Sequence, residues 1–383
     1  MGKRELLLII CFVIVGAVVY QATAPPPGPN EKGFSLSRLM EAARREMRGN
    51  RATAEVTTAS TILLDPEITE LRVVGPLVEL RITGEDRPDL QASLHVRSNA
   101  YDEAEAKRYA EEWVLKPDRA ASSLVLRLDH PTGRHTGRQR ASLTLTVPAR
   151  LRARIEARPG KLAIANVAGV ETTNSGGEAV LKNIAGRVSV THRGGSITIE
   201  DVAALKFTGR STEFKLSGVS GDTSIVMEQG GELRASNLGG PLDIESRNAE
   251  ITLENLEATR GPIRVSAING VVTMNGVKSD TRVDGRNAEL NVTMNGAAPI
   301  AIYTEGEEVA LTLPPGGFRF DAVVMDGRIA PEPLFRELGL ELTVAEDAKE
   351  SRASGAVRGG GPTITVRTTR GDLTLREPDT VER

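Results

Sequence analysis

The sequence repeats itself at short intervals between residues 188 and 296. The segment RNAEI at 247–251 returns as RNAEL at 286–290, and VTMNG at 272–276 returns at 292–296. These offsets of 39 and 20 residues correspond to two periods and one period of a repeat that is too short for helical repeats or four-stranded blades. We therefore expect an all-β chain that forms a β-solenoid, or β-helix, of roughly 18–20-residue coils.

Each period contains two short alternating runs that are separated by a glycine turn. In the clearest copy, Val188 and Val190 precede the turn, and Ile197 and Ile199 follow it. Alternation of β-branched residues at period two predicts strands. One such coil buries too few aliphatic side chains to offset its backbone entropy, so the coils must stack to be stable.

Most coils close with Asn or Asp followed by an aliphatic residue. The copies are Asn166-Val167, Asn183-Ile184, Asp201-Val202, Asn237-Leu238 and Asn255-Leu256, with looser copies at Asn275 and Asn295 and a degenerate one at Gly218-Val219. Asn and Asp tolerate the left-handed conformation of a tight corner. We interpret the series as a structural ladder and expect its aliphatic neighbours, Val219 included, to line one inner edge of the core.

The composition suits a narrow β core and gives no reason to expect a nucleic-acid partner. The chain has 38 Gly and 20 Pro in 383 residues with 3% aromatics, so packing must rely on Val, Ile and Leu. A net charge of −3 lacks the basic excess that is typical of nucleic-acid binding.

The amino terminus indicates export from the cytoplasm. Lys3 and Arg4 precede an apolar run over residues 6–20, so residues 1–24 are expected to be a membrane anchor or a signal segment. The anchor is favoured, because Pro25 would directly follow the Ala22-Thr23-Ala24 cleavage site. The body would then be extracytoplasmic in the cell envelope, periplasmic or at the cell surface. Cys11 is the only cysteine, so the body has no intramolecular disulfide.

The remaining chain divides into four regions. Residues 25–50 hold a Pro-rich linker and an amphipathic helix. Residues 51–158 form a β-rich region with one helix over 102–115, which begins at Asp102 and Glu105 and packs with Trp113; this region is expected to cap the solenoid. Residues 159–313 carry the repeats, and 314–383 form C-terminal coils with a helical insertion near 331–353.

Several ordered motifs resemble those of the bacterial DUF4097 family of adhesin-like proteins with β-strand repeats. They are LVELRITG at 77–84, NIAGRVSV at 183–190, VALTLP at 309–314 and GGGPTITVRTTRGDLTL at 359–375. The resemblance covers about residues 70–375. It implies a β-solenoid envelope protein, and it brings no catalytic residues to this chain.

Catalytic and metal-binding patterns are weak. His130 and His135 are close in sequence but lie in an Arg- and Gly-rich loop, and no nucleophile triad or phosphate loop is found. A polysaccharide-cleaving enzyme would need clustered carboxylates. The candidates are Glu200, Asp201, Asp243, Glu245, Glu250 and Glu254. We expect no enzyme activity, no metal and no cofactor.

One basic segment stands out. Between Arg134 and Lys161 there are eight basic residues and one acid, Glu156. Arg150, Arg152 and Arg154 alternate with apolar residues and should line one strand face. They are the candidate binding residues, for an anionic envelope polymer, although a solvated face is the ordinary interpretation.

The sequence therefore predicts a non-enzymatic, membrane-tethered β-solenoid that acts as an adhesin-like binding or structural surface protein. Its partners would be the membrane and an anionic polymer or a protein. Two alternatives remain open. One is a solenoid carbohydrate-active enzyme with paired acids in a groove, and the other is a self-assembling envelope scaffold or signalling accessory.

Overall fold

The computed structural model describes residues 52–130, 139–345 and 349–377, together with Phe12, Val15, Gly16 and Val19. The expected anchor, Pro-rich linker and amphipathic helix otherwise lie outside the described residues. Within these ranges, no helix has the length and apolar character needed to cross a bilayer.

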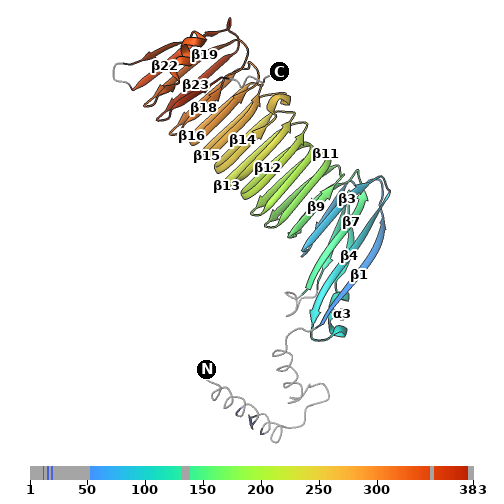
Figure 1. The fold of residues 1–383 in the computed structure, drawn as a ribbon. Coiled ribbons are helices and arrows are strands. Elements are labelled where there is room, and N and C mark those ends of the chain that lie inside the picture. Colours follow the sequence, from blue (N-terminus) through green and yellow to red (C-terminus); the bar gives the residue numbers. More distant parts are fainter. Residues whose placement is uncertain are drawn as a thin grey trace, which may run out of the picture. The chain divides into compact units, whose positions relative to one another are not determined.

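The chain is mainly β, and its strands join into one long sheet with mostly parallel pairing (Figure 1). The first strands are β1 (Ala52–Leu63), β2 (Glu70–Val74), β3 (Glu79–Glu85), β4 (Asp89–Ala100), β5 (Val114–Ala120), β6 (Ser123–Asp129), β7 (Gln139–Pro148), β8 (Arg152–Ile155), β9 (Lys161–Ala165) and β10 (Gly169–Ser175). Six longer strands follow: β11 (Glu178–Arg193), β12 (Ser196–Val219), β13 (Thr223–Leu238), β14 (Leu242–Glu254), β15 (Ile263–Val277) and β16 (Thr281–Met294). The last are β17 (Ile300–Glu305), β18 (Val309–Thr312), β19 (Phe318–Met325), β20 (Ile329–Ala330), β21 (Glu341–Val344), β22 (Glu350–Val357), β23 (Thr363–Thr369) and β24 (Leu373–Arg376).

Contacts divide the chain into two units. The described part of the smaller unit comprises residues 52–56, 97–112 and 139. It contains helix α3 (Glu103–Glu111), in which the Asp102 carboxylate accepts a hydrogen bond from the Glu105 amide at 2.8 Å. The predicted start is therefore confirmed, but the helix ends at 111 instead of 115. Lys116 precedes Pro117, and a residue before proline favours extended backbone, so the chain enters β5 at Val114.

The larger unit arranges its parallel strands in two rows. Row 1 is the series that pairs in register with β10, and row 2 is the series that pairs with β9. Strand β11 belongs to both, because residues 178–182 pair with β9 while 188–193 pair with β10. The longer strands up to β16 are divided between the two rows in the same way. Residues that pair on adjacent strands are therefore about one sequence period apart.

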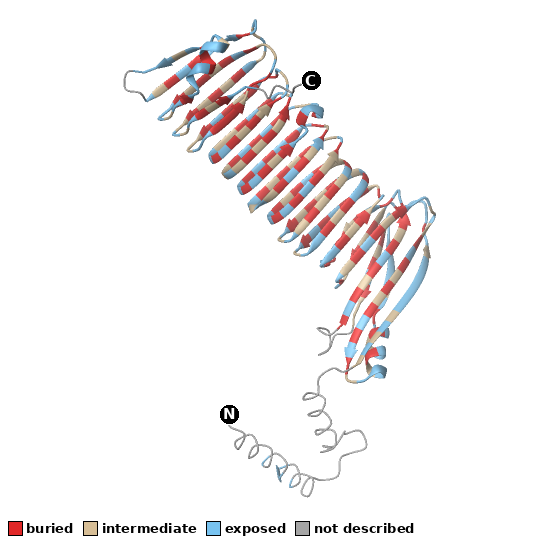
Figure 2. Ribbon diagram, in the orientation of Figure 1, coloured by how far each residue is buried: buried red, intermediate tan, exposed pale blue. Residues whose placement is uncertain are grey.

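Both rows bury one face and expose the other, as the alternating bands in Figure 2 show. In row 1 Leu205 and Phe207 are buried, and in row 2 Ile197 and Ile199 are buried. Phe207 of row 1 stacks on Phe214 of row 2, with 4.0 Å between the ring centroids. The inner faces of the two rows therefore meet, and the core lies between them.

The predicted corner ladder is confirmed. Asn166, Asn183, Asp201, Asn237 and Asn255 all have positive φ angles between 54° and 60°. Asn183 donates to the side chain of Asn166 at 3.2 Å, and Asn255 donates to that of Asn237 at 3.3 Å. The aliphatic residues that follow are all buried: Val167, Ile184, Val202, Val219, Leu238 and Leu256.

Two looser corner positions were predicted wrongly, and a second ladder was not predicted. At the copy containing Asn275, the positive φ angle falls on Gly276, next to a register shift between Asn275 and Val277. Asn295 has no positive φ angle and instead bonds to Glu257 at 2.9 Å. At the opposite corner, three asparagines form a further ladder through side-chain hydrogen bonds of 2.8 and 3.4 Å: Asn248, Asn269 and Asn287.

The order of strands departs from the order of the sequence at both ends of the rows. At the C-terminal end, β23 lies between β17 and β19, with parallel pairing to both, and β24 lies between β18 and β20. At the other end, β2 lies between β6 and β8, and β3 lies between β7 and β9. A simple succession of coils would not give this arrangement.

Antiparallel strands end row 1 on both sides. Strand β5 pairs antiparallel with β6, and β22 pairs antiparallel with both β19 and β21. Helix α4 (Glu332–Leu338) lies in the expected insertion and ends at Gly339, whose φ is 66°. Strands β5 and β22 occupy the edges of β6 and β19 that would otherwise be free to pair with other chains.

Candidate functional site

Arg152 and Arg154, two of the three arginines expected to line one strand face, lie on β8 as predicted. Ala153 and Ile155 are buried, and Arg152 is exposed on the outer face of row 1 with Arg154 beside it. Arg154 is neutralised by two carboxylates, Glu156 at 3.4 Å and Glu171 at 3.7 Å. Arg152 makes no ion pair among the described residues, and its register partner on β2 is Glu70.

Arg150 does not belong to this strand face. It lies in the turn before β8, and its guanidinium donates to the backbone carbonyls of Asp65 at 3.2 Å, Pro66 at 3.1 Å and Ile68. These bonds satisfy carbonyls in the loop between β1 and β2. Arg150 therefore fixes this loop, and the structure does not bring its charge together with Arg152 and Arg154 as one stripe.

The structure instead brings Arg152 together with cations from later coils. Arg152 and Arg187 both border Gly169, which lies between them in row 1. Lys206 pairs with Ser189 on the following strand. Arg187, Arg193 and Lys206 are exposed and, like Arg152, make no ion pair within the described part of the chain. We call Arg152, Arg187, Arg193, Lys206 and Arg210 the basic face.

Two of these cations lie directly side by side. Arg193 and Arg210 are register partners on β11 and β12, so their backbones are about 4.8 Å apart. Arg210 bonds to the Gln229 amide oxygen at 2.7 Å, and no carboxylate balances either guanidinium within the described ranges. Like charges on paired strands repel each other, and a bound anion would relieve that repulsion.

Outward threonines separate the two lines of cations. Thr173, Thr191 and Thr208 are register partners on three successive strands. Arg187 and Lys206 lie on one side of this strip, and Arg193 and Arg210 lie on the other. The arrangement offers hydroxyl groups between positive charges, along the direction in which the strands stack.

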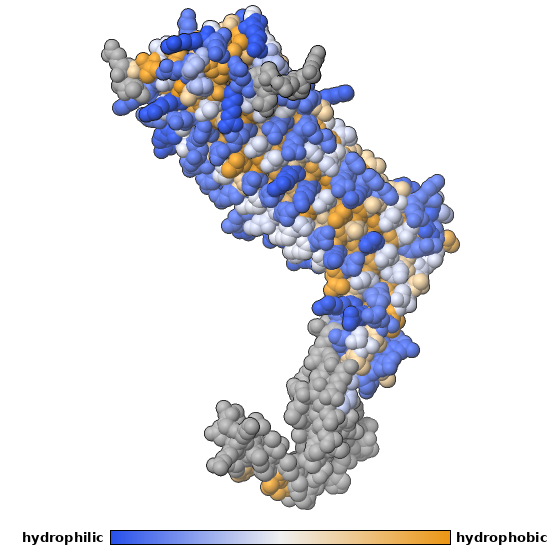
Figure 3. All heavy atoms as spheres, in the orientation of Figure 1, coloured by the Kyte–Doolittle hydropathy of each residue, from blue (hydrophilic) through white to orange (hydrophobic). Residues whose placement is uncertain are grey.

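The outward positions of row 2 carry cations beside acids, and the register partners Lys215 and Arg234 are each paired with a carboxylate. Glu213, Glu232 and Glu250 are consecutive register partners. Lys215 bonds to Glu213 at 2.8 Å, and this hydrogen bond lowers the pKa of the Glu213 carboxyl below its usual value. The basic face is therefore specific to row 1. In Figure 3 the visible surface is largely hydrophilic, with interrupted apolar patches.

The acids that the sequence offers for catalysis are divided between the two rows. Asp243 and Glu245 lie in row 1, Glu250 and Glu254 lie in row 2, and Asp201 forms a corner. Glu200 and Glu254 line one hollow, but Ser217 and Ser236 occupy the strands between them. That separation is about 14 Å for three strand spacings, beyond the roughly 5–9.5 Å that glycosidase pairs require.

The remaining sequence candidates are placed as follows. Trp113 is buried, and its ring lies 5.5 Å from the ring of His130; His135 lies outside the described residues. Among the residues that are described, no three His, Cys, Asp or Glu side chains are grouped so that they could hold a metal ion.

The cations of the basic face outside β8 were missed because they are 35 to 58 residues away from Arg152 in the sequence. A signal for some of them exists in the repeat. Arg193, Arg210, Arg247 and Arg286 all lie just before the same corner of their coils. An alignment of the coils on the corner that holds Asn248, Asn269 and Asn287 would have shown that basic residues recur just before it.

Comparisons with known proteins assign no family to this chain. No protein-family model and no curated protein matches the chain. One solved structure that resembles it is a "putative cell adhesion protein" from Clostridium sporogenes ATCC 15579, with 9% sequence identity and a TM-score of 0.19. The match covers 84% of this chain and 100% of the other chain.

Proposed function

We propose that this chain is a non-enzymatic, membrane-tethered, extracytoplasmic β-solenoid, and that its basic face binds an anionic polymer of the cell envelope. It would act as an adhesin-like binding or structural surface protein. The observation that carries the proposal is the adjacent Arg193–Arg210 pair, which no described carboxylate balances.

Three features support the solenoid. Strands one period apart pair in parallel register, the inner faces of both rows meet at Phe207 and Phe214, and both corners carry asparagine ladders. A chain that alternates between two such rows winds once around the core in each period. The stack then presents wide, regular outer faces, which suit repeating polymers better than small ligands.

The chemistry of the basic face favours a flexible polyanion. Its cations recur at multiples of about 4.8 Å along the stack, so a chain with regularly spaced sulfate, phosphate or carboxylate groups can contact several of them at once. The threonine hydroxyls between them can donate hydrogen bonds to the same groups. Exposed charges bind weakly one at a time, so affinity requires several simultaneous contacts.

Retention on a heparin matrix tests the polymer-binding proposal. The purified full chain in mild detergent should bind at low salt and elute as sodium chloride rises, because screening shortens the range of charge interactions to about 8 Å at physiological ionic strength. Lipopolysaccharide on the same support should behave similarly. Passage of the full chain through both columns at low salt would remove the basis of the proposal.

The location is proposed from the amino terminus. Lys3 and Arg4 before an apolar run support an anchor with the body outside the cytoplasm. A C-terminal alkaline phosphatase fusion should be active in cells, and the protein should fractionate with membranes and resist extraction by carbonate. An inactive fusion together with cytosolic fractionation would contradict this location.

The non-enzymatic proposal rests on the placement of the acids. Glu200 and Glu254 are three strands apart, and Asp243 and Glu245, which share the outward face of β14, are both exposed to solvent. Incubation of the full chain with reducible polysaccharides should release no new reducing ends or unsaturated products. If the wild type releases such products and the variants with Glu200 or Glu254 replaced do not, the chain would be a carbohydrate-active enzyme.

A further inference from the structure

Three of the four edges at which the rows end are protected against further pairing. Strand β5, which ends row 1 on the N-terminal side, carries Lys116, Pro117, Asp118 and Arg119, and charges and proline on an edge strand discourage pairing. On the C-terminal side, row 2 ends at β20, which has two residues, and row 1 ends at β21, which has four. Such short strands offer few free backbone groups to another chain.

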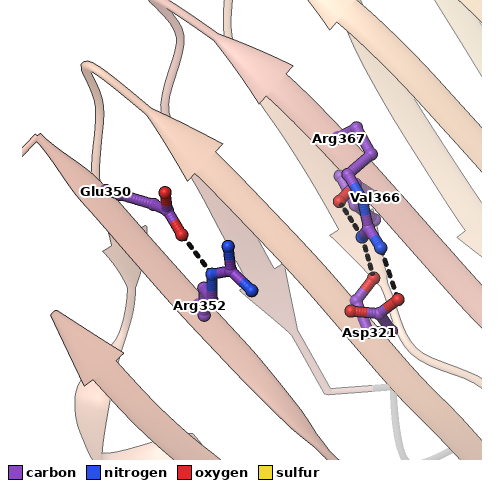
Figure 4. Close-up of polar contacts among 5 residues, drawn as sticks. All are labelled: Asp321, Glu350, Arg352, Val366 and Arg367. Atoms are coloured by element: carbon purple, nitrogen blue, oxygen red, sulfur yellow. Dashed lines mark hydrogen bonds and ion pairs between the residues drawn. The ribbon is translucent and has the colours of Figure 1, made fainter. Parts of the chain in front are cut away.

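The C-terminal end of row 1 also carries charged side chains next to β21. On β22, Arg352 is paired with Glu350, and the neighbouring strands β19 and β23 are joined by the pair of Asp321 with Arg367 (Figure 4). The Arg352 side chain is 64% exposed. A strand that added to this end would lie close to these charges, so this edge is both short and charged.

The fourth edge, at strand β1, has none of these protections. β1 follows β4 at the N-terminal end of row 2 (Figure 1). It has 12 residues and no proline, and Glu55 is its only charged residue. Thr53 bonds to Asn99 and Thr57 bonds to His95, so residue numbers fall on β4 as they rise on β1 and the pairing is antiparallel. The other edge of β1 has no partner among the described strands.

Little in the single chain stabilises β1 as a strand. None of its residues is buried, whereas alternate residues of β4 are buried. Its inward side chains Val56 and Ile62 are only half-buried, and Leu63 is 74% exposed. Ordering a strand costs backbone entropy, which β1 offsets with one ladder and no core residue. A second ladder on the free edge would add backbone hydrogen bonds and cross-strand contacts.

The charge pattern of β1 is compatible with a second copy of the same strand. Identical antiparallel strands are related by a two-fold axis, and residues opposite each other lie on the same face of the sheet. If the axis passes through Thr57, Glu55 faces Ala59, and if it passes through Thr58, Glu55 faces Thr61. In neither register do the two Glu55 carboxylates oppose each other.

We propose that β1 pairs antiparallel with β1 of a second copy of this chain and so forms a head-to-head dimer. In both registers Ile62 faces a small residue, Ala52 or Ala54, so the inward side chains do not collide. The two-fold axis reverses the direction in which the strands stack, so row 2 of one copy continues into row 2 of the other. This proposal does not depend on polymer binding, because β1 carries none of the cations of the basic face.

The mass of the full chain in mild detergent, measured by light scattering after size exclusion, tests the dimer. The wild type should be dimeric and should dissociate on dilution. Ala59→Glu with Thr61→Glu places a carboxylate opposite Glu55 in either register, so it should weaken dimerisation by tenfold or more. Ala59→Lys with Thr61→Lys places an ammonium group there, so it should dimerise at least as tightly as the wild type. A monomeric wild type, or equal dimerisation of the two variants, would overturn the proposal.

Cysteine cross-linking tests which strand forms the contact. Cys11 is the only cysteine, so single cysteines can be introduced in a Cys11→Ser background. Thr57→Cys and Thr58→Cys each place a thiol on one of the two possible axes, where opposite Cα atoms are about 4.5–5.5 Å apart, within reach of a disulfide. One of them should form a linked dimer on oxidation with diamide, whereas Thr343→Cys on the exposed edge strand β21 should not. Absence of a link in both β1 variants would contradict the proposed pairing.

Discussion

At the scale of single residues, alternation along each strand decides between core and solvent. Ile199 is completely buried, and Thr198 points outward on the same strand. Ile199→Asp would place an uncompensated charge in the core and should cost about 4 kcal/mol or more. Thr198→Asp should change stability by less than about 0.5 kcal/mol. Chemical denaturation of both variants checks this, and equal midpoints would show that the assigned strand facing is wrong.

His192 is a residue whose burial the sequence did not reveal. It occupies an inward position of row 1 and is fully buried, with Asn174 and Gly209 as its neighbours on the adjacent strands. Neither neighbour carries a charge. Burial lowers the pKa of the imidazole, and a backbone contact with Gly194 offsets this only in part. The neutral form is therefore the form that the fold accommodates.

A loss of stability in mild acid follows from this pKa shift. The unfolded imidazole titrates near pH 6.5 and the folded one titrates lower, so the unfolded state binds more protons as the pH falls. The contribution of neutral His192 is fully present above about pH 6.5 and decreases below it. His192→Leu should flatten the dependence of the melting temperature on pH between about 6.5 and 5, before most carboxylates titrate. An identical slope in the wild type and the variant would count against this assignment.

At the scale of elements, the corner ladder combines backbone conformation with a side-chain bond. Asn183 has a φ of 55° and donates to Asn166. Asn183→Gly keeps the left-handed backbone and loses only the side-chain bond. Asn183→Ala also incurs the cost of a left-handed L-residue, about 1–2 kcal/mol. Thermal melting should therefore rank the wild type above Gly and Gly above Ala, and a more stable Ala variant would argue against this corner geometry.

The elements that could be predicted are those encoded by local patterns. Alternation identified the strands, and Asn before an aliphatic residue identified the first corner. Helix α3 was predicted too long because apolar spacing continues through Trp113, whereas Pro117 favours strand β5. Arg150 was assigned to the strand face by the same alternation, but its partners are loop carbonyls more than 80 residues away in the sequence.

At the scale of the whole chain, the order of the strands in the rows depends on pairing that no local pattern encodes. Strands β23 and β24 insert between coils that precede them in the sequence. Their repeat pattern predicts a coil but not its neighbours, because every coil offers a similar edge to pair with. The cations of the basic face were hidden for the same reason, since adjacency of coils brings them together.

Deletion of residues 362–383 tests the inserted coil. The deletion removes the strands that join β17 to β19 and β18 to β20. Because stability in stacked repeats depends on nearest neighbours, amide exchange should accelerate in β17, β18 and β19 and remain slow in β11 to β13. Unchanged protection in β17 to β19 would contradict the inserted position.

Polymer binding should depend on which face carries the cations and not on net charge. Two double charge reversals change the net charge equally: Arg193→Glu with Arg210→Glu in row 1, and Lys215→Glu with Arg234→Glu in row 2. We predict that the first variant is no longer retained on heparin at low salt and that the second elutes close to the wild type, with circular dichroism showing that both variants are folded. Equal loss of retention in the two variants would contradict the account.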